Sequence, residues 1–176
     1  QRIKKTLPQI KLINFFRNPI DRAYSAYNHS SKFGWEHSSF EAAIESEIER
    51  INLMNDKPEL TINNIDPVNF LQFSYLRHGH YASNLENWFK YFKKNQFMHF
   101  FTEDLDQNYD EIMNSLFVFF NLSEIKLKKE DRKNIGIGKG KYPSMNEKTR
   151  DFLIDYYKPH NEKLYNLIGK KFDWDK

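Results

Sequence analysis

The residues best suited to chemistry lie where an expected strand meets an expected helix. Residues 11–16 form a short, nearly continuous apolar run, which is typical of a strand buried on both faces of a parallel sheet. Arg17 follows at the carboxyl end of this strand, the edge at which open α/β sheets bind ligands. An arginine at this edge can hold a phosphate through two charge-assisted hydrogen bonds. This placement predicts a binding site for a small anion.

The helix expected after that arginine supports the same prediction. Asn18 and Pro19 are typical of an N-cap and a first helical residue. The helix therefore turns its N-terminal amide groups and its partial positive charge toward the same edge of the sheet. Ser25, nearly two turns along, adds a hydroxyl donor.

One face of this helix carries further polar groups. Arg22, Ser25 and His29 are spaced i, i+3 and i+7, so they share that face. The residues alone leave two interpretations open. In one, the corner binds a phosphate; in the other, Arg17 and Asp21 form a surface ion pair and Ser25 is incidental.

Positive charge is concentrated in one segment of the chain. The 176 residues carry a net charge of +3, yet residues 126–141 hold seven Lys or Arg and two Asp or Glu, a local charge of +5. Within this segment, Lys139 and Lys141 flank Gly140, so two flexible cations stand on a backbone that can approach a ligand closely. Such concentration favours a discrete anionic ligand, and no aromatic side chains interleave the lysines as nucleic-acid binding would require.

The order of expected elements is strand, helices, strand, helices, which indicates an α/β fold. The second strand covers residues 96–101. The expected helices cover residues 18–33, 38–54, 81–92, 109–120, 146–157 and 160–168. Two strands cannot make the sheet that so many amphipathic helices need to cover, so we expect at least two more strands before residue 1. Residues 1–176 are then the C-terminal portion of a single domain.

Composition excludes several classes of site. The chain has no Cys, which rules out disulfides, thiolate metal sites and cysteine nucleophiles and favours a reducing cytoplasm. No apolar run approaches the roughly 20 residues of a membrane span. His78 and His80 lie at i and i+2 with no third ligand, so we expect no metal site. The 16 Phe and 10 Tyr need burial and predict a globular domain.

Residues 17–27 closely resemble a known motif. Their sequence, Arg-Asn-Pro-Ile-Asp-Arg-Ala-Tyr-Ser-Ala-Tyr, is similar to the 3′-phosphate motif of sulfotransferases that use 3′-phosphoadenosine 5′-phosphosulfate (PAPS), particularly the heparan sulfate type and its bacterial relatives. Further matches to this family follow in order along the chain, at residues 79–88, 97–105, 138–145, 161 and 172–174. The resemblance therefore covers nearly the whole chain.

The resemblance implies the P-loop-NTPase-like sulfotransferase fold, an α/β fold with a central parallel sheet flanked by helices, here without its N-terminal strands. It implies that Arg17 and Ser25 grip the 3′-phosphate of PAPS. It also implies that a basic loop closes over the nucleotide, and leaves open whether Lys139 or Lys141 makes the contact. The nucleotide-binding residues assigned in this loop are Lys139, Gly140, Lys141 and Tyr142.

The catalytic centre is expected to be incomplete within these residues. His29 aligns with a histidine close to the reacting centre in the N-sulfotransferase branch, so the resemblance implies a catalytic role for it. The Lys-Gly-Thr type loop and the base, often Glu, that the family places after its first strand are absent here and are expected upstream. The reaction needs no metal.

The expected function is transfer of a sulfuryl group from PAPS to a hydroxyl or amine of a carbohydrate, lipid or small molecule. The alternative is a non-catalytic module that binds PAP, the desulfated nucleotide, or a sulfated glycan. A P-loop kinase is disfavoured because ATP lacks the 3′-phosphate that the motif binds. Secreted members of the family often place a disulfide ahead of the basic loop, so its absence favours a bacterial-type cytoplasmic enzyme. The acceptor and the oligomeric state are not encoded in these motifs.

Overall fold

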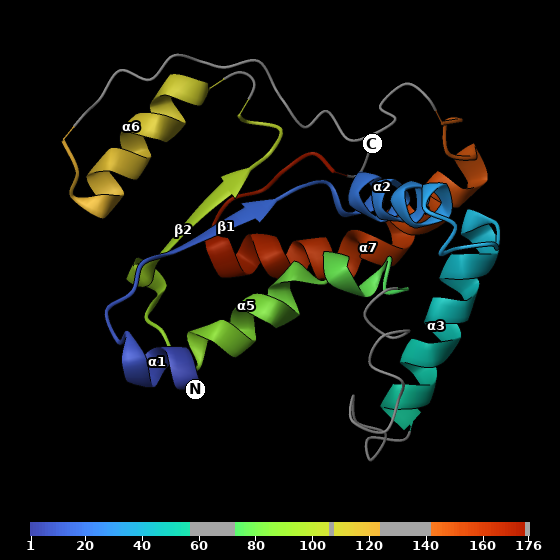
Figure 1. Ribbon diagram of the computed structural model, residues 1–176, viewed down its shortest axis with the longest axis horizontal. Coiled ribbons are helices and arrows are strands. Elements are labelled where there is room, and N and C mark those ends of the chain that lie inside the picture. Colours follow the sequence, from blue (N-terminus) through green and yellow to red (C-terminus); the bar gives the residue numbers. More distant parts are fainter. Residues whose placement is uncertain (57–72, 106–107, 124–141, 175–176) are drawn as a thin grey trace. The chain divides into compact units, whose positions relative to one another are not determined.

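The computed structural model describes residues 1–56, 73–105, 108–123 and 142–174 (Figure 1). The chain divides into two compact units, each made of two chain segments. The strand unit comprises Gln1–Arg17 and Ala82–Ile135, and the helical unit comprises Asn18–Tyr81 and Gly136–Lys176. The boundary between Arg17 and Asn18 falls within the motif that carries the predicted anion site.

The strand unit is built on β1 (Leu12–Phe16) and β2 (Phe97–Phe101), which pair in parallel as expected. Figure 1 shows the two arrows side by side and pointing the same way. The register runs from Leu12 opposite Phe97 to Phe16 opposite Phe101. Thr102 N donates to Phe16 O at 2.9 Å, which continues the ladder past the strand ends. Because both strands end at this edge, Arg17 emerges from a fixed strand terminus.

In the described part of the chain, these strands are accompanied by α1 (Arg2–Thr6), α5 (Tyr81–Phe89), the short 3₁₀ helix η2 (Lys94–Gln96) and α6 (Tyr109–Phe120). The sequence analysis did not predict α1. It placed the end of α5 at residue 92, whereas the helix ends at Phe89. Phe89 and Phe92 nevertheless both pack edge-on against Phe97, with ring centroids 5.0 and 6.4 Å away. These ring contacts hold the turn that leads into β2 in place.

The helical unit contains α2 (Pro19–Lys32), α3 (Phe40–Asp56), the 3₁₀ helix η1 (Arg77–Gly79) and α7 (Glu147–Ile168). Their buried side chains meet in one cluster, in which Tyr75 and Leu76, just before η1, are 1% and 0% exposed. The other members of the cluster are Ile20, Ala23, Phe40, Ala43, Ile44, Leu153 and Tyr157. Among its described residues, α2, α3 and α7 pack around the segment that leads into η1.

The prediction of two closing helices is wrong, because α7 runs without a break through Pro159. Proline lacks the N–H that would bond to the carbonyl four residues earlier. Here that carbonyl belongs to Asp155, and both Asp155 and Pro159 are exposed, so water can satisfy it. Tyr157 and Asn161, at 0% and 2% exposure, lie buried on either side of the proline. Packing on the buried face thus maintains the helix where the local sequence favours an end.

Within the part of the chain that the structure describes, no helix is long and apolar enough to cross a membrane.

Candidate functional site

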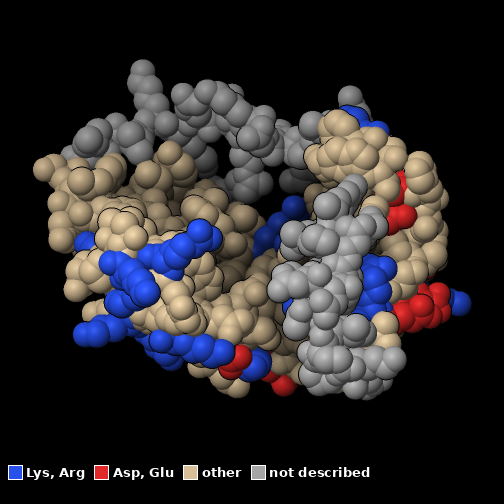
Figure 2. All heavy atoms as spheres, turned by 60° about the horizontal axis from the view of Figure 1, so that its bottom comes forward, with Lys and Arg blue, Asp and Glu red and all other residues tan. Residues whose placement is uncertain are grey.

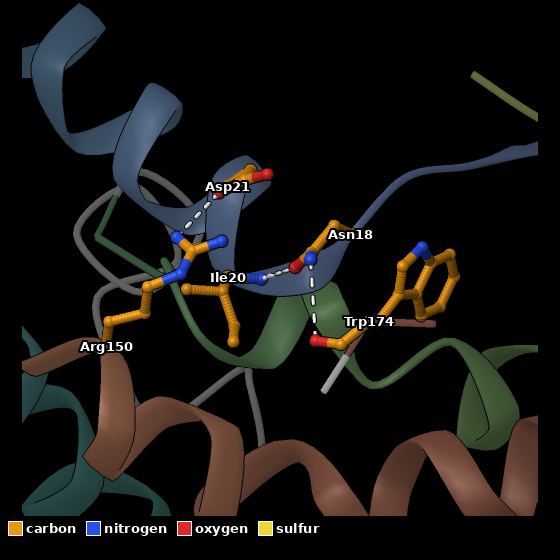
Figure 3. Close-up of polar contacts among 5 residues, drawn as sticks. All are labelled: Asn18, Ile20, Asp21, Arg150 and Trp174. Carbon is orange, nitrogen blue, oxygen red and sulfur yellow. Dashed lines mark hydrogen bonds and ion pairs between the residues drawn. The ribbon is translucent and has the colours of Figure 1, made fainter. Parts of the chain in front are cut away.

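The N-terminus of α2 is fixed by side-chain and backbone contacts of Asn18. Its Oδ1 accepts a hydrogen bond from Ile20 N at 2.9 Å, and its Nδ2 donates to Trp174 O at 3.5 Å (Figure 3). Asn18 is 8% exposed and Pro19 occupies the first turn. This confirms the predicted cap. The free N-terminal amides of α2 and the positive end of its helix dipole therefore lie at the turn that begins with Asn18 and Pro19.

Asp21, in the first turn of α2, pairs with Arg150 of α7. Arg150 Nη1 lies 3.0 Å from Asp21 Oδ1 (Figure 3), and the side chains are 34% and 43% exposed. An exposed pair of this kind contributes about 0–1 kcal/mol. The structure thus provides Asp21 with a partner on α7, where the alternative interpretation had paired it with Arg17.

Gly79 holds η1 against the start of α2. A Cβ on this residue would lie 2.7 Å from Tyr157 Cε1 and 2.9 Å from Pro19 Cβ, so only glycine fits without displacement. Tyr157 Oη in turn donates to Leu76 O at 2.8 Å. This close approach fixes Pro19, and with it the direction in which α2 begins. Gly79, the first residue of the matched segment 79–88, therefore acts through packing.

The polar face expected on α2 is divided between two environments. Arg22 Nη2 donates to Tyr75 O, toward the core of the helical unit. His29 is exposed at the other end of the helix, and Ser25 lies half-buried between them. Helical spacing placed these three residues on one face, but it could not show that Arg22 turns toward the segment before η1.

His29 is part of an exposed aromatic cluster that sequence reasoning missed. Its ring lies 4.8 Å from Phe33 and 5.9 Å from Trp35, and those two rings stack at 5.2 Å with an interplanar angle of 23°. Phe33 and Trp35 are 49% and 50% exposed. Two large exposed apolar rings beside a histidine are typical of a surface that binds a partner or ligand. The available signal was the pair of rings four and six residues after His29.

The end of the basic loop contacts α2. Tyr24 Oη donates to Pro143 O at 2.9 Å, and the rings of Tyr24 and Tyr142 meet edge to face at 5.6 Å. Tyr24 is the neighbour of Ser25 in the sequence, so Tyr142 packs beside the predicted phosphate-binding helix. The other predicted loop residues, Lys139, Gly140 and Lys141, lie outside the described residues.

Two half-buried histidine rings stack on each other next to η1. His80 and His160 have centroids 3.9 Å apart and an interplanar angle of 9°. His80 Nε2 is 2.9 Å from Tyr156 Oη. Burial, and then the charge of His160, lowers the pKa of His80 to about 4, and burial lowers the pKa of His160. Both rings are therefore neutral at pH 7 and pack as aromatic side chains.

Glu47 of α3 is buried and binds the backbone at the start of η1. It is 2% exposed and accepts hydrogen bonds from Leu76 N at 2.7 Å and Arg77 N at 2.8 Å. Burial raises the pKa of Glu47 despite these bonds. The carboxylate thereby caps η1 from within the core. Among the described residues, no group of three or more His, Cys, Asp or Glu is arranged to hold a metal.

Comparison with known families decides the identity of the domain. Residues 2–167 match the sulfotransferase domain family. The chain belongs to this family. The family that the motif at residues 17–27 implied is therefore confirmed.

Several relatives of this sulfotransferase chain act on carbohydrates according to their names. Bifunctional heparan sulfate N-deacetylase/N-sulfotransferase 1 of Xenopus laevis is 28% identical over 97% of the chain. The human N-deacetylase/N-sulfotransferase 3 is 30% identical over 97% of it, and human carbohydrate sulfotransferase 15 is 27% identical over 95%. The chain spans only 20% of the length of each of the first two relatives and 31% of the third.

The fold of this sulfotransferase chain is shared with a solved structure. The crystal structure of a sulfotransferase from Alicyclobacillus acidocaldarius superposes with a TM-score of 0.76 at 22% sequence identity. The match covers 100% of this chain and 62% of that one. The expected fold class, a P-loop-like α/β fold with a parallel sheet flanked by helices, is confirmed.

Proposed function

We propose that this chain binds PAPS and takes part in sulfuryl transfer to a hydroxyl or amine of a carbohydrate acceptor. The observation that carries the proposal is the motif at residues 17–27, which continues from the end of β1 into the capped start of α2. Membership of the sulfotransferase domain family supports the reaction type. The named relatives support a carbohydrate as the acceptor class.

The donor groups in this motif suit the 3′-phosphate of the nucleotide. Arg17 offers a planar fork for two parallel hydrogen bonds, and Ser25 offers a hydroxyl donor from α2. The capped N-terminus of α2 favours negative charge. Tyr142, at the end of the basic loop, packs on Tyr24 of α2. In this proposal Lys139, Gly140 and Lys141 close over the nucleotide.

In the reaction, PAPS supplies the sulfuryl group: the acceptor atom forms a bond to sulfur while the sulfur–oxygen bond to the 5′-phosphate breaks, leaving its electron pair on the phosphate oxygen. In this proposal His29 takes the proton that the acceptor loses, because a ring nitrogen of histidine can act as a general base. Arg17 and Ser25 hold the nucleotide so that the reacting atoms meet in line.

The aromatic cluster beside His29 suits a sugar acceptor. Phe33 and Trp35 present stacked, half-exposed rings against which the apolar face of a pyranose can pack. The adjacent His29 ring lies within 4.8 Å of Phe33, so a sugar seated on these rings brings its hydroxyl or amine close to the base. We therefore propose that Phe33 and Trp35 bind the acceptor.

The direct test of activity is a transfer assay on the protein at its full natural length, with PAPS and de-N-sulfated heparan sulfate and with measurement of PAP release and of sulfate bound to the polymer. His29→Ala is expected to lower kcat by about 10²- to 10⁴-fold and to leave PAP affinity unchanged. His37→Ala, at a nearby exposed histidine, is the matched control. A protein that binds PAP but sulfates neither amines nor hydroxyls would instead be the non-catalytic binding module.

A further inference from the structure

A basic hollow lies within the strand unit, at the amino ends of β1 and β2. Its volume is about 260 Å³. Three lysines and three side-chain amides line it: Lys4, Gln9, Lys11, Lys93, Asn95 and Gln96. No carboxylate is part of this lining among the described residues. Figure 2, which brings the bottom of Figure 1 forward, shows Lys and Arg gathered over the face that carries α1.

The walls of the hollow are held together by Gln96, which is 9% exposed. Its Nε2 donates to Pro8 O at 3.1 Å and to Ile10 O at 2.9 Å. Its Oε1 accepts from Lys93 N at 3.1 Å. Two of these bonds join the segment that leads into β1 to the turn that leads into β2, and the bond from Lys93 lies within that turn. The shape of the hollow is therefore defined by the fold of the strand unit, because the buried side-chain amide of Gln96 bonds to the backbone on both sides of the hollow.

The lysines of the hollow are positioned by neutral groups. Lys4 Nζ donates to Pro8 O at 3.0 Å and lies 5.2 Å from the Phe92 ring centroid. Lys11 Nζ donates to Phe119 O and lies 5.3 Å from the Phe119 ring centroid. An ammonium group has three N–H donors, so each lysine retains donors after one carbonyl bond. Carbonyls and rings do not neutralise the positive charge of Lys4 and Lys11, which favours an anion in the hollow.

The hollow is separate from the predicted nucleotide motif. Lys11 precedes β1 and Arg17 follows it, so the length of the strand separates them by about 20 Å at roughly 3.3 Å per residue. The hollow lies at the amino edge of the strand pair, whereas nucleotides in open α/β folds bind at the carboxyl edge. The function proposed above does not use these lysines.

We propose that this hollow binds an oxyanion group of the sulfate or phosphate type. Its volume holds one tetrahedral oxyanion with a few waters, since a water occupies about 30 Å³ in the liquid. Lys4, Lys11 and Lys93 supply the charge, and Gln9 and Asn95 supply neutral donors at the rim. The group can come from free sulfate or phosphate in solution, or from a sulfate ester on a carbohydrate.

The test is a titration of the ¹⁵N-labelled chain with sodium sulfate, followed by amide chemical shifts and compared with sodium chloride at equal ionic strength. We expect saturable shifts at the amides of residues 9–11 and 93–96 and at the Gln96 side-chain amide, with sulfate but not with chloride. Lys93→Gln and Lys4→Gln should each weaken binding about fivefold, the effect of one unit charge at about 4 Å in water.

Lys90→Gln is the matched control, because Lys90 is an exposed lysine that bonds to Asn87 at 2.8 Å and is not among the lining residues. It should bind sulfate like the unmodified chain. Shifts that do not saturate, that chloride reproduces, or that Lys93→Gln and Lys4→Gln leave unchanged would overturn the proposal.

A further titration with a sulfated glucosamine disaccharide and with inorganic phosphate identifies the source. Tighter binding of the disaccharide by tenfold or more assigns the hollow to a carbohydrate sulfate ester, and equal binding assigns it to the free oxyanion. PAP affinity is measured in parallel on Lys93→Gln, where no change is expected. The proposal for the hollow and the proposal for the nucleotide motif can therefore be refuted independently of each other.

Discussion

At the scale of single residues, the proposal that Phe33 and Trp35 bind a sugar acceptor rests on the exposed rings beside His29. Trp35 is half exposed and stacks on Phe33 at 5.2 Å, and this contact does not need a ligand to form. The pair is thus preorganised, and little conformational entropy is lost when a sugar ring packs on it.

Trp35→Ala is therefore expected to raise the KM for a carbohydrate acceptor about two- to tenfold, the usual range for one aromatic contact, with little change in PAP affinity. Trp88→Ala is the control, because Trp88 is also exposed, at 39%, and lies on α5. Steady-state kinetics with acceptor varied at saturating PAPS give the measurement. An unchanged KM for Trp35→Ala would remove this residue from the acceptor site.

The stacked pair of His80 and His160 makes the helical unit sensitive to acid. In the folded chain the pKa of His80 is lowered to about 4 and that of His160 is lowered as well, whereas unfolded histidines titrate near their usual value. Between about pH 6.5 and 4 the unfolded chain thus binds more protons. The free energy of unfolding contributed by these rings is complete above pH 6.5 and falls as the pH drops through that window.

Charged groups near His80 and His160 also affect the pKa values of these two histidines. Arg77 and Arg22 add to the lowering of the pKa of His80, and Lys163 adds to that of His160. Glu47, whose pKa is raised, acts in the opposite direction, since the folded chain takes up its proton more readily. A variant that removes a histidine of the pair but retains Glu47 separates the effect of the histidines on stability from the effect of Glu47.

His160→Phe keeps the stacked ring and removes its titration. We expect urea unfolding between pH 4 and 7 to show a smaller loss of stability for this variant than for the unmodified chain. His37→Phe, at an exposed histidine, should leave the pH profile unchanged. Parallel profiles for His160→Phe and the unmodified chain would contradict the role assigned to the pair.

At the scale of elements, α2 connects the fold to the proposed nucleotide site. Its start is fixed by the Asn18 cap, by the packing of Pro19 on Gly79 and by the pair of Asp21 with Arg150. These contacts come from three different parts of the helical unit. The direction of the helix dipole, and with it the favourable field for a phosphate, therefore depends on tertiary packing as well as on the local sequence.

Asn18→Ala should lower the free energy of unfolding by about 1 kcal/mol, the usual cost of losing an N-cap, and should weaken PAP binding. Asn146→Ala is the matched control. Asn146 caps α7 by accepting from Lys148 N at 2.9 Å, so its loss costs similar stability but leaves the motif intact. Urea unfolding and calorimetry on both variants give the result. Equal PAP affinity in the two variants would show that the α2 cap does not support nucleotide binding.

The elements that sequence reasoning predicted are those with strong local signals. The apolar run of β1 and the Asn18-Pro19 cap were sufficient to place the corner, because both depend on neighbouring residues. The continuity of α7 was missed because it depends on burial of Tyr157 against residues far away in the sequence. The helix predicted from residue 38 begins at Phe40, and Ser39 Oγ just before it accepts a hydrogen bond from Ala42 N at 3.2 Å.

The site was predicted less completely than the fold. Asp21 and Arg150 are 129 residues apart, so their pairing had no local signal. The basic hollow combines residues from two distant segments, and neither segment alone indicates a pocket. The resemblance to the family implied that Arg17 and Ser25 bind the phosphate, whereas spacing alone had left a surface ion pair between Arg17 and Asp21 open as the other interpretation.

At the scale of the whole molecule, the chain combines two compact units of one sulfotransferase domain. Arg17 ends one unit and Asn18 begins the other, so the motif that carries the proposed function spans both units in the sequence. Binding of the 3′-phosphate requires that both units be folded and that the motif be intact. A measurement of nucleotide affinity therefore tests the folding of both units and the proposed role of the motif together.

The most direct measurement is calorimetric titration of the protein, at its full natural length, with PAP, ATP and 5′-AMP. We predict a clear preference for PAP, because only PAP carries the 3′-phosphate, and we predict that Arg17→Ala abolishes this preference and Ser25→Ala reduces it. Arg150→Ala, which removes another arginine near the start of α2, should retain it. Equal affinity for PAP and 5′-AMP, or a preference that survives Arg17→Ala, would contradict the proposal that this motif binds the 3′-phosphate of PAPS.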